Sequence, residues 1–82
     1  MTLTPETIQA TRQWFADNAA ACIAEVEAGR VWVNDPARYF AHQRQAAADS
    51  LAGKYDHTFT FLQRAHYIQT GECVPFLPPS SL

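Results

Sequence analysis

The longest helical pattern of the chain reads LTPETIQATRQWFADNAAACIAEVEAG, residues 3–29. Its start is marked by Thr4 and Pro5, because a threonine hydroxyl can cap free backbone N–H groups and proline suits the first helical position. Its end is marked by Gly29, since glycine readily adopts the left-handed conformation that commonly terminates a helix. The sequence therefore predicts a helix over about 5–28.

One side of this helix is apolar. At about 100° per residue, a single stripe collects Ile8, Phe15, Ala19, Cys22, Ile23 and Val26. Leu3 precedes the helix and is placed to pack against Ile8 as a hydrophobic staple. Trp14 falls well away from the stripe. We expect the stripe to face the core and Trp14 to lie at the surface.

A second helix is predicted over 36–52. Asp35 is a capping residue, Pro36 again suits the first helical position, and Gly53 follows the end. The apolar stripe of this helix is narrow and consists of Phe40, Ala47 and Leu51, with Arg44 embedded among them. Two interpretations of Arg44 stay open: its stem packs beside Phe40 with the charge in solvent, or it contacts a partner.

A third helix is predicted over about 57–70, ending at Gly71. Its apolar residues form two opposite groups: Phe59, Leu62 and His66 on one side, and Phe61, Ala65 and Ile68 on the other. A helix that is apolar on both sides is expected to be buried on both sides. One side would pack on the first two helices, and the other would be covered by the proline-rich tail, residues 72–82, or by a second copy.

Together these patterns predict one all-α domain over 1–82, a compact bundle of three helices with an extended proline-rich C-terminal tail. The 82 residues are 48% hydrophobic, which suits a folded chain with one small core. No basic segment followed by an apolar stretch opens the chain, and no apolar run approaches the ~18 residues that span a bilayer. We therefore expect a cytoplasmic protein without membrane contact.

The charge is slightly acidic and unevenly placed. A net charge of −2 argues against a dedicated nucleic-acid binder, which is normally basic. Residues 1–29 carry a net −3, whereas residues 36–71 carry a net +2. This division is compatible with antiparallel self-association.

No pattern in the sequence indicates catalysis or metal binding. The two cysteines, Cys22 and Cys73, do not form a closely spaced ligand pair with each other or with a histidine, as a zinc site usually requires. Glu25 and Glu27 are two positions apart on a helix and so point in different directions. The three glycines do not form a phosphate-binding loop. We predict a protein that is not an enzyme and has no cofactor and no metal.

Aromatic residues and arginines outside the core stripes are the better functional signal, because tryptophan, tyrosine and arginine dominate protein-binding hot spots. Some of the aromatic residues would instead close the ends of a small bundle. The candidate partner-binding residues are Trp14, Trp32, Arg38, Tyr39, Arg44, Arg64, Tyr67 and Phe76.

The C-terminal third, from Phe61-Leu62-Gln63-Arg64-Ala65 through Tyr67 and Gln69-Thr70-Gly71-Glu72 to Val74 and Leu77, resembles the ends of small uncharacterised proteins of phages and prophages of proteobacteria. The resemblance spans roughly twenty residues and carries over no functional residue. It implies an accessory role, since short, acidic, helical phage proteins are often inhibitors of host proteins, anti-CRISPR and other anti-defence proteins among them.

The sequence therefore predicts a protein that binds and blocks a host protein by surface contact, with a homodimer through residues 56–70 as an additional expectation. The alternative is a small nucleic-acid-binding transcriptional regulator that uses Arg38, His42, Gln45 and Lys54.

Overall fold

The computed structural model describes residues 2–73, which form three helices: α1 (Pro5–Glu27), α2 (Pro36–Leu51) and α3 (Phe59–Thr70). No strand occurs within this range. The predicted all-α fold of three helices is confirmed. The expected extended tail lies outside the described residues from position 74 onward.

The helix boundaries follow from local capping. The hydroxyl of Thr4 accepts a hydrogen bond from the backbone N–H of Thr7 at 3.1 Å, and the carboxylate of Asp35 accepts one from Arg38 at 3.2 Å. Thr58 caps α3 in the same way, so this helix begins at Phe59, slightly later than predicted. Each helix is followed by a glycine with φ between 76° and 81°.

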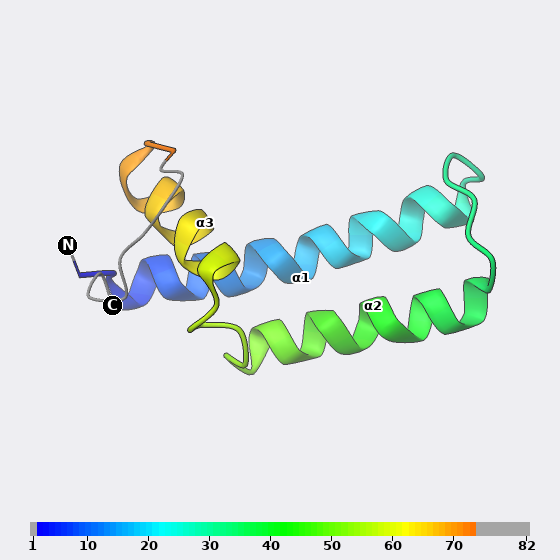
Figure 1. Ribbon diagram of the computed structural model, residues 1–82, viewed down its shortest axis with the longest axis horizontal. Coiled ribbons are helices and arrows are strands. Elements are labelled where there is room, and N and C mark those ends of the chain that lie inside the picture. Colours follow the sequence, from blue (N-terminus) through cyan, green and yellow to red (C-terminus); the bar gives the residue numbers. More distant parts are fainter. Residues whose placement is uncertain (1, 74–82) are drawn as a thin grey trace.

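α1 and α2 run antiparallel as a hairpin, and α3 crosses the N-terminal half of α1 (Figure 1). The molecule is elongated along the hairpin, with extents of 41, 23 and 19 Å. α3 contacts α1 and makes no helix-to-helix contact with α2. The expectation that the third helix packs on both preceding helices was wrong in this respect, because the 52–58 turn carries the chain across to α1.

The core lies where α3 crosses α1. Phe61, Leu62 and Ala65 of α3 are 1%, 6% and 0% exposed, and Leu3, Ile8 and Phe15 pack against them. The rings of Phe15 and Phe61 are stacked, with centroids 6.1 Å apart. Ile8 and Phe15 of the predicted core stripe thus face the core at this end of the molecule, and Leu3 packs against the same α3 residues.

One part of α3 is buried against α1, while the cover expected for its other side, the proline-rich tail or a second copy, lies outside the described residues. Leu62 from the first predicted group and Phe61 and Ala65 from the second are buried, whereas Phe59 is 43% exposed and Ile68 is 37% exposed. The physical reason is that, of the other two helices, only α1 lies against α3. One neighbouring helix covers one face.

Small residues are buried on both helices of the hairpin: Ala16 and Ala19 on α1 and Ser50 on α2. Small side chains let the two backbones approach closely, and Ser50 Oγ donates to the backbone carbonyl of Arg12 at 2.9 Å. Leu51, expected in the core stripe, is 45% exposed because Ser50 takes the inward position beside it.

Two buried threonines on α1 were not expected from the apolar stripe. Thr7 and Thr11 lie in the half of the helix that α3 crosses, and Thr11 is 0% exposed. Thr11 Oγ1 donates to the carbonyl of Thr7 at 2.7 Å, which satisfies the hydroxyl inside the helix. Thr11 is therefore buried without leaving its hydroxyl group unpaired.

A polar contact fixes the turn between α2 and α3. Arg12 Nη2 and Nε donate to the two carboxylate oxygens of Asp56 at 2.5 and 3.2 Å. The hydrogen bond to Asp56 raises the pKa of Arg12, so the cation persists throughout the usual pH range. We call Arg12, Ser50, Gly53 and Asp56 the Arg12 clasp, because Arg12 binds α2 through its carbonyl and the turn through its side chain.

A matched pair of leucine substitutions tests the position of the core. Leu62→Ala should lower the free energy of unfolding by about 2–5 kcal/mol, since it empties a buried site. Leu51→Ala removes the same atoms from an exposed site and should cost under about 1 kcal/mol. Urea unfolding followed by circular dichroism measures both, and equal losses would contradict the assigned core.

A matched pair of glycine substitutions tests the Arg12 clasp. Gly53 (φ +81°) and Gly29 (φ +78°) have the same backbone conformation, so alanine at either site costs about 1–2 kcal/mol of backbone strain. At Gly53 the new Cβ would also stand 2.9 Å from Arg12 Nη2, whereas at Gly29 it meets no atom within 4 Å. Gly53→Ala should therefore be the more destabilising variant in thermal unfolding, and a smaller loss than for Gly29→Ala would contradict the clasp.

Candidate functional site

Three of the candidate partner-binding residues meet in one groove between α1 and α3. Trp14 comes from α1, and Arg64 and Tyr67 come from α3. Trp14 is 37% exposed and Tyr67 is 42% exposed, as expected for residues outside the core stripes. The groove has a volume of about 350 Å³. We call it the α1–α3 groove.

Arg64 is held by aromatic rings. Its guanidinium carbon lies 4.0 Å from the ring centroid of Trp14 and 5.6 Å from that of Tyr67. Cation–π contacts of this kind contribute about 0.5–2 kcal/mol. Phe15 packs at right angles against the Trp14 ring, with centroids 5.0 Å apart, and so connects the groove to the core. The aromatic contacts thereby fix the position of the cation.

The groove also contains residues that sequence analysis did not nominate: Asn18, Thr60, Gln63 and Cys73. Helical spacing could have revealed three of them. Asn18 lies four residues after Trp14, and Thr60 lies four residues before Arg64. Gln63 lies four residues before Tyr67, so each of the three shares a helix face with a nominated residue. Cys73 follows the end of α3, where no periodic pattern applies.

Trp32, Arg38 and Tyr39 lie elsewhere, at the loop 28–35 and the first turn of α2, which we call the hairpin tip. Trp32 is 83% exposed, the largest value among the exposed large apolar residues of the described chain. A shallower hollow of about 290 Å³, lined in part by Arg38, Tyr39 and Asp35, lies beside it. The positive charge of Arg38 and the negative charge of Asp35 offset each other in this hollow.

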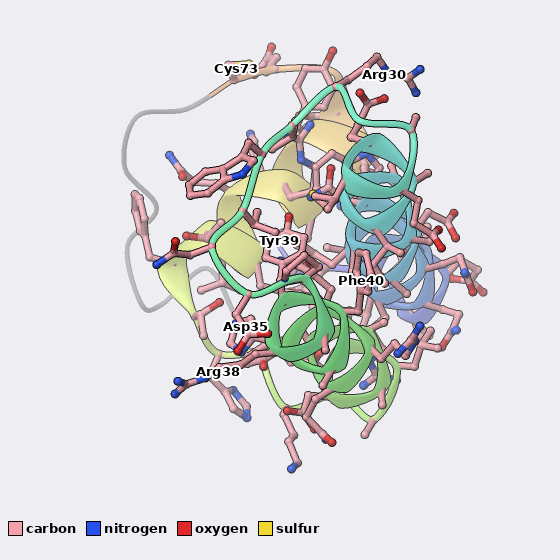
Figure 2. The ribbon with its side chains drawn as sticks, turned by 90° about the vertical axis from the view of Figure 1, so that its right-hand side faces the viewer. Arg30, Asp35, Arg38, Tyr39, Phe40 and Cys73 are labelled. Carbon is pink, nitrogen blue, oxygen red and sulfur yellow. The ribbon has the colours of Figure 1, made fainter. Side chains whose placement is uncertain are left out.

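Tyr39 has mainly a packing role. Figure 2 shows Arg38 pointing away from the helices and Tyr39 pointing between them. Burial raises the pKa of the Tyr39 hydroxyl, and a hydrogen bond with Cys22 adds to the rise. A neutral, half-buried tyrosine that is hydrogen-bonded to its own chain offers little to a partner.

Arg44 and Phe76 are the last two candidates. Arg44 is exposed on α2, with its guanidinium carbon 5.9 Å from the ring centroid of Phe40. The guanidinium itself therefore lies over the Phe40 ring at an exposed position. Phe76 lies outside the described residues. The structure thus brings together Trp14, Arg64 and Tyr67, and the candidates among the described residues that do not line this groove are Trp32, Arg38, Tyr39 and Arg44.

Over residues 2–73, no three histidine, cysteine, aspartate or glutamate side chains gather as a metal site would require. No helix in this part of the chain is long and apolar enough to cross a membrane. Cys22 and Cys73 are both free thiols.

No protein-family profile, curated protein or solved structure matches the chain. The features of the α1–α3 groove therefore rest on the sequence and the geometry of this chain.

Two residues of the alternative nucleic-acid-binding set are engaged with a carboxylate. Gln45 Nε2 donates to Asp49 at 2.8 Å, and Lys54 Nζ lies 3.2 Å from Asp49. The hydrogen bond from Gln45 has the largest effect in lowering the pKa of the Asp49 carboxyl group, and the hydrogen bond from Lys54 lowers it further. Asp49 therefore offsets the positive charge on this side of α2.

The lowered pKa predicts a pH dependence. Because the folded-state pKa of Asp49 lies below the unfolded-state value near 3.8, its contribution is present above that value and is lost as pH falls through the folded-state pKa. Wild type should therefore melt higher than Asp49→Asn at about pH 6, and the gap should narrow as the pH falls below 3.8. A gap that stays constant as the pH falls below this value would contradict the assigned contacts.

Proposed function

We propose that this chain is a non-catalytic protein that binds another protein in the α1–α3 groove and blocks it by surface contact. The observation that carries the proposal is the fixed Arg64 cation over Trp14 and beside Tyr67. These three residue types are the ones enriched at binding hot spots. Trp14, Arg64 and Tyr67 line one hollow on the surface.

The geometry supports binding more than catalysis. The residues that line the groove within the described chain include neither a histidine nor a carboxylate, the groups most often used as a general acid or base. Cys73 at the groove has no such base beside it among them. A fixed cation between aromatic rings instead suits recognition of a surface.

The resemblance of the C-terminal third to phage accessory proteins supplies the identity of the partner in this proposal, a protein of the bacterial host. A homodimer through residues 56–70 is the competing occupant, because α3 supplies Arg64 and Tyr67 to the groove. The exposed side of α2 supports nucleic-acid binding less well, since Asp49 engages Lys54 and Gln45.

Site-specific photo-cross-linking in a bacterial host tests the proposal. A photoreactive residue is placed at Asn18, inside the groove, or at Ala24, an exposed position of α1 that does not line it. The Asn18 position should give a discrete adduct with a second protein, and the Ala24 position should not. Adducts of equal yield from both positions would contradict the proposal.

Two arginine variants serve as a matched pair in the same experiment. Arg64→Ala should weaken partner binding at least about 30-fold, as loss of a hot-spot arginine does. Arg44→Ala removes an arginine that also lies over a ring, outside the groove, and should leave the adduct unchanged. If the adduct contains a second copy of this chain, the homodimer replaces the host protein as the occupant and the proposal is wrong.

A further inference from the structure

We infer that the α1–α3 groove takes an acidic peptide segment, with an aspartate or glutamate carboxylate on Arg64 and an adjacent apolar side chain against Trp14 and Tyr67. This inference rests on the proposed function and specifies the chemistry of the partner. It follows from the charge, the burial and the donor geometry of Arg64.

Arg64 differs from the other arginines and from Lys54 because it is partly buried and yet has no carboxylate partner in residues 2–73. Arg12, Arg30 and Lys54 each form an ion pair with a carboxylate of this chain. In residues 2–73, no carboxylate lies within ion-pair distance of Arg38, Arg44 or Arg64. Arg38 and Arg44 are exposed to water, but Arg64 is half-buried. Arg64 is thus the arginine that has lost part of its hydration without gaining a carboxylate.

The aromatic contacts leave the hydrogen-bonding edge of Arg64 for a ligand. A guanidinium meets an aromatic ring through its flat face, whereas its N–H groups point outward in its plane. The 4.0 Å separation from the Trp14 centroid is that of face contact. A carboxylate can therefore approach in the plane and accept two parallel hydrogen bonds while the Trp14 contact persists.

The rest of the groove complements such a segment. Arg64 is the only residue with a formal charge among those that line the groove in the described chain, so no acidic group there repels a carboxylate. Asn18 and Thr60 add neutral polar groups near the backbone of a bound peptide, and the rings of Trp14 and Tyr67 supply apolar surface. One carboxylate beside one apolar side chain matches this arrangement.

A nucleic acid fits less well, although its bases could stack on the same rings. Binding to a phosphate backbone draws on several cations, and the groove supplies one on a chain with a net charge of −2. A peptide carboxylate needs only one guanidinium. The charge count therefore favours the acidic peptide.

Selection from a random peptide library displayed on ribosomes tests the inference. Selected peptides are synthesised and titrated against the Trp32→Phe variant, in which Trp14 is the remaining tryptophan and its fluorescence reports the groove. The selected peptides should share an aspartate or glutamate next to an apolar residue. Replacing that acid by its amide should weaken binding by about tenfold or more.

Arg64 variants complete a double-mutant cycle. Arg64→Gln should weaken binding of the acidic peptide as much as the amide substitution in the peptide does. The two changes together should weaken binding little more than either change alone. Arg64→Lys keeps the charge without the planar pair of donors and should fall between wild type and Arg64→Gln. Circular dichroism of each variant confirms that the helices are retained.

Failure of the inference and failure of the proposed function give different results. Peptides that change Trp14 fluorescence but bind equally well as acid and amide would overturn the acidic class and leave groove binding standing. Peptides that bind without changing Trp14 fluorescence and without sensitivity to Arg64→Gln would overturn both. Tighter binding of an oligothymidine single strand than of any selected peptide would overturn the inference in favour of a nucleic acid.

Discussion

The ion pair between Arg12 and Asp56 is the contact on which the placement of α3 depends. α3 does not contact α2, so the hairpin alone leaves its direction open. Exposed ion pairs usually contribute little, but this one is bidentate and both side chains are less than one-third exposed. It joins the middle of α1 to the turn that leads into α3, while burial of Phe61, Leu62 and Ala65 supplies most of the packing energy.

The same placement creates the α1–α3 groove. Arg64 and Trp14 are fifty residues apart in the sequence, and they meet because α3 crosses α1 at this angle and register. At the far end of α3, Gln69 accepts a hydrogen bond from the backbone N–H of Thr4 at 3.1 Å. α3 is thus held at its N-terminal end by the Arg12 clasp and near its C-terminal end by Gln69. The groove lies between the two attachments.

Local signals in the sequence predicted the helices well, because capping residues such as Thr4, Asp35 and the three glycines act within a few residues of their own position. Which face of each helix is buried was harder to predict. Ser50 and Thr11 are buried because their hydroxyls bond to backbone carbonyls, which no hydrophobic pattern reveals. The candidate site was predictable in part. Residue type identified Trp14, Arg64 and Tyr67, but their proximity depends on tertiary structure, which includes the contact between Arg12 and Asp56.

By fixing the turn before α3, the Arg12 clasp sets the position of Arg64 over Trp14. The direct measurement is the ring-current shift of the Arg64 side-chain protons by NMR, compared between wild type and Asp56→Asn. The account predicts a large upfield shift in wild type that shrinks in Asp56→Asn while the amide signals of the α1–α2 hairpin remain in place. An unchanged Arg64 shift in a folded Asp56→Asn variant would contradict the account.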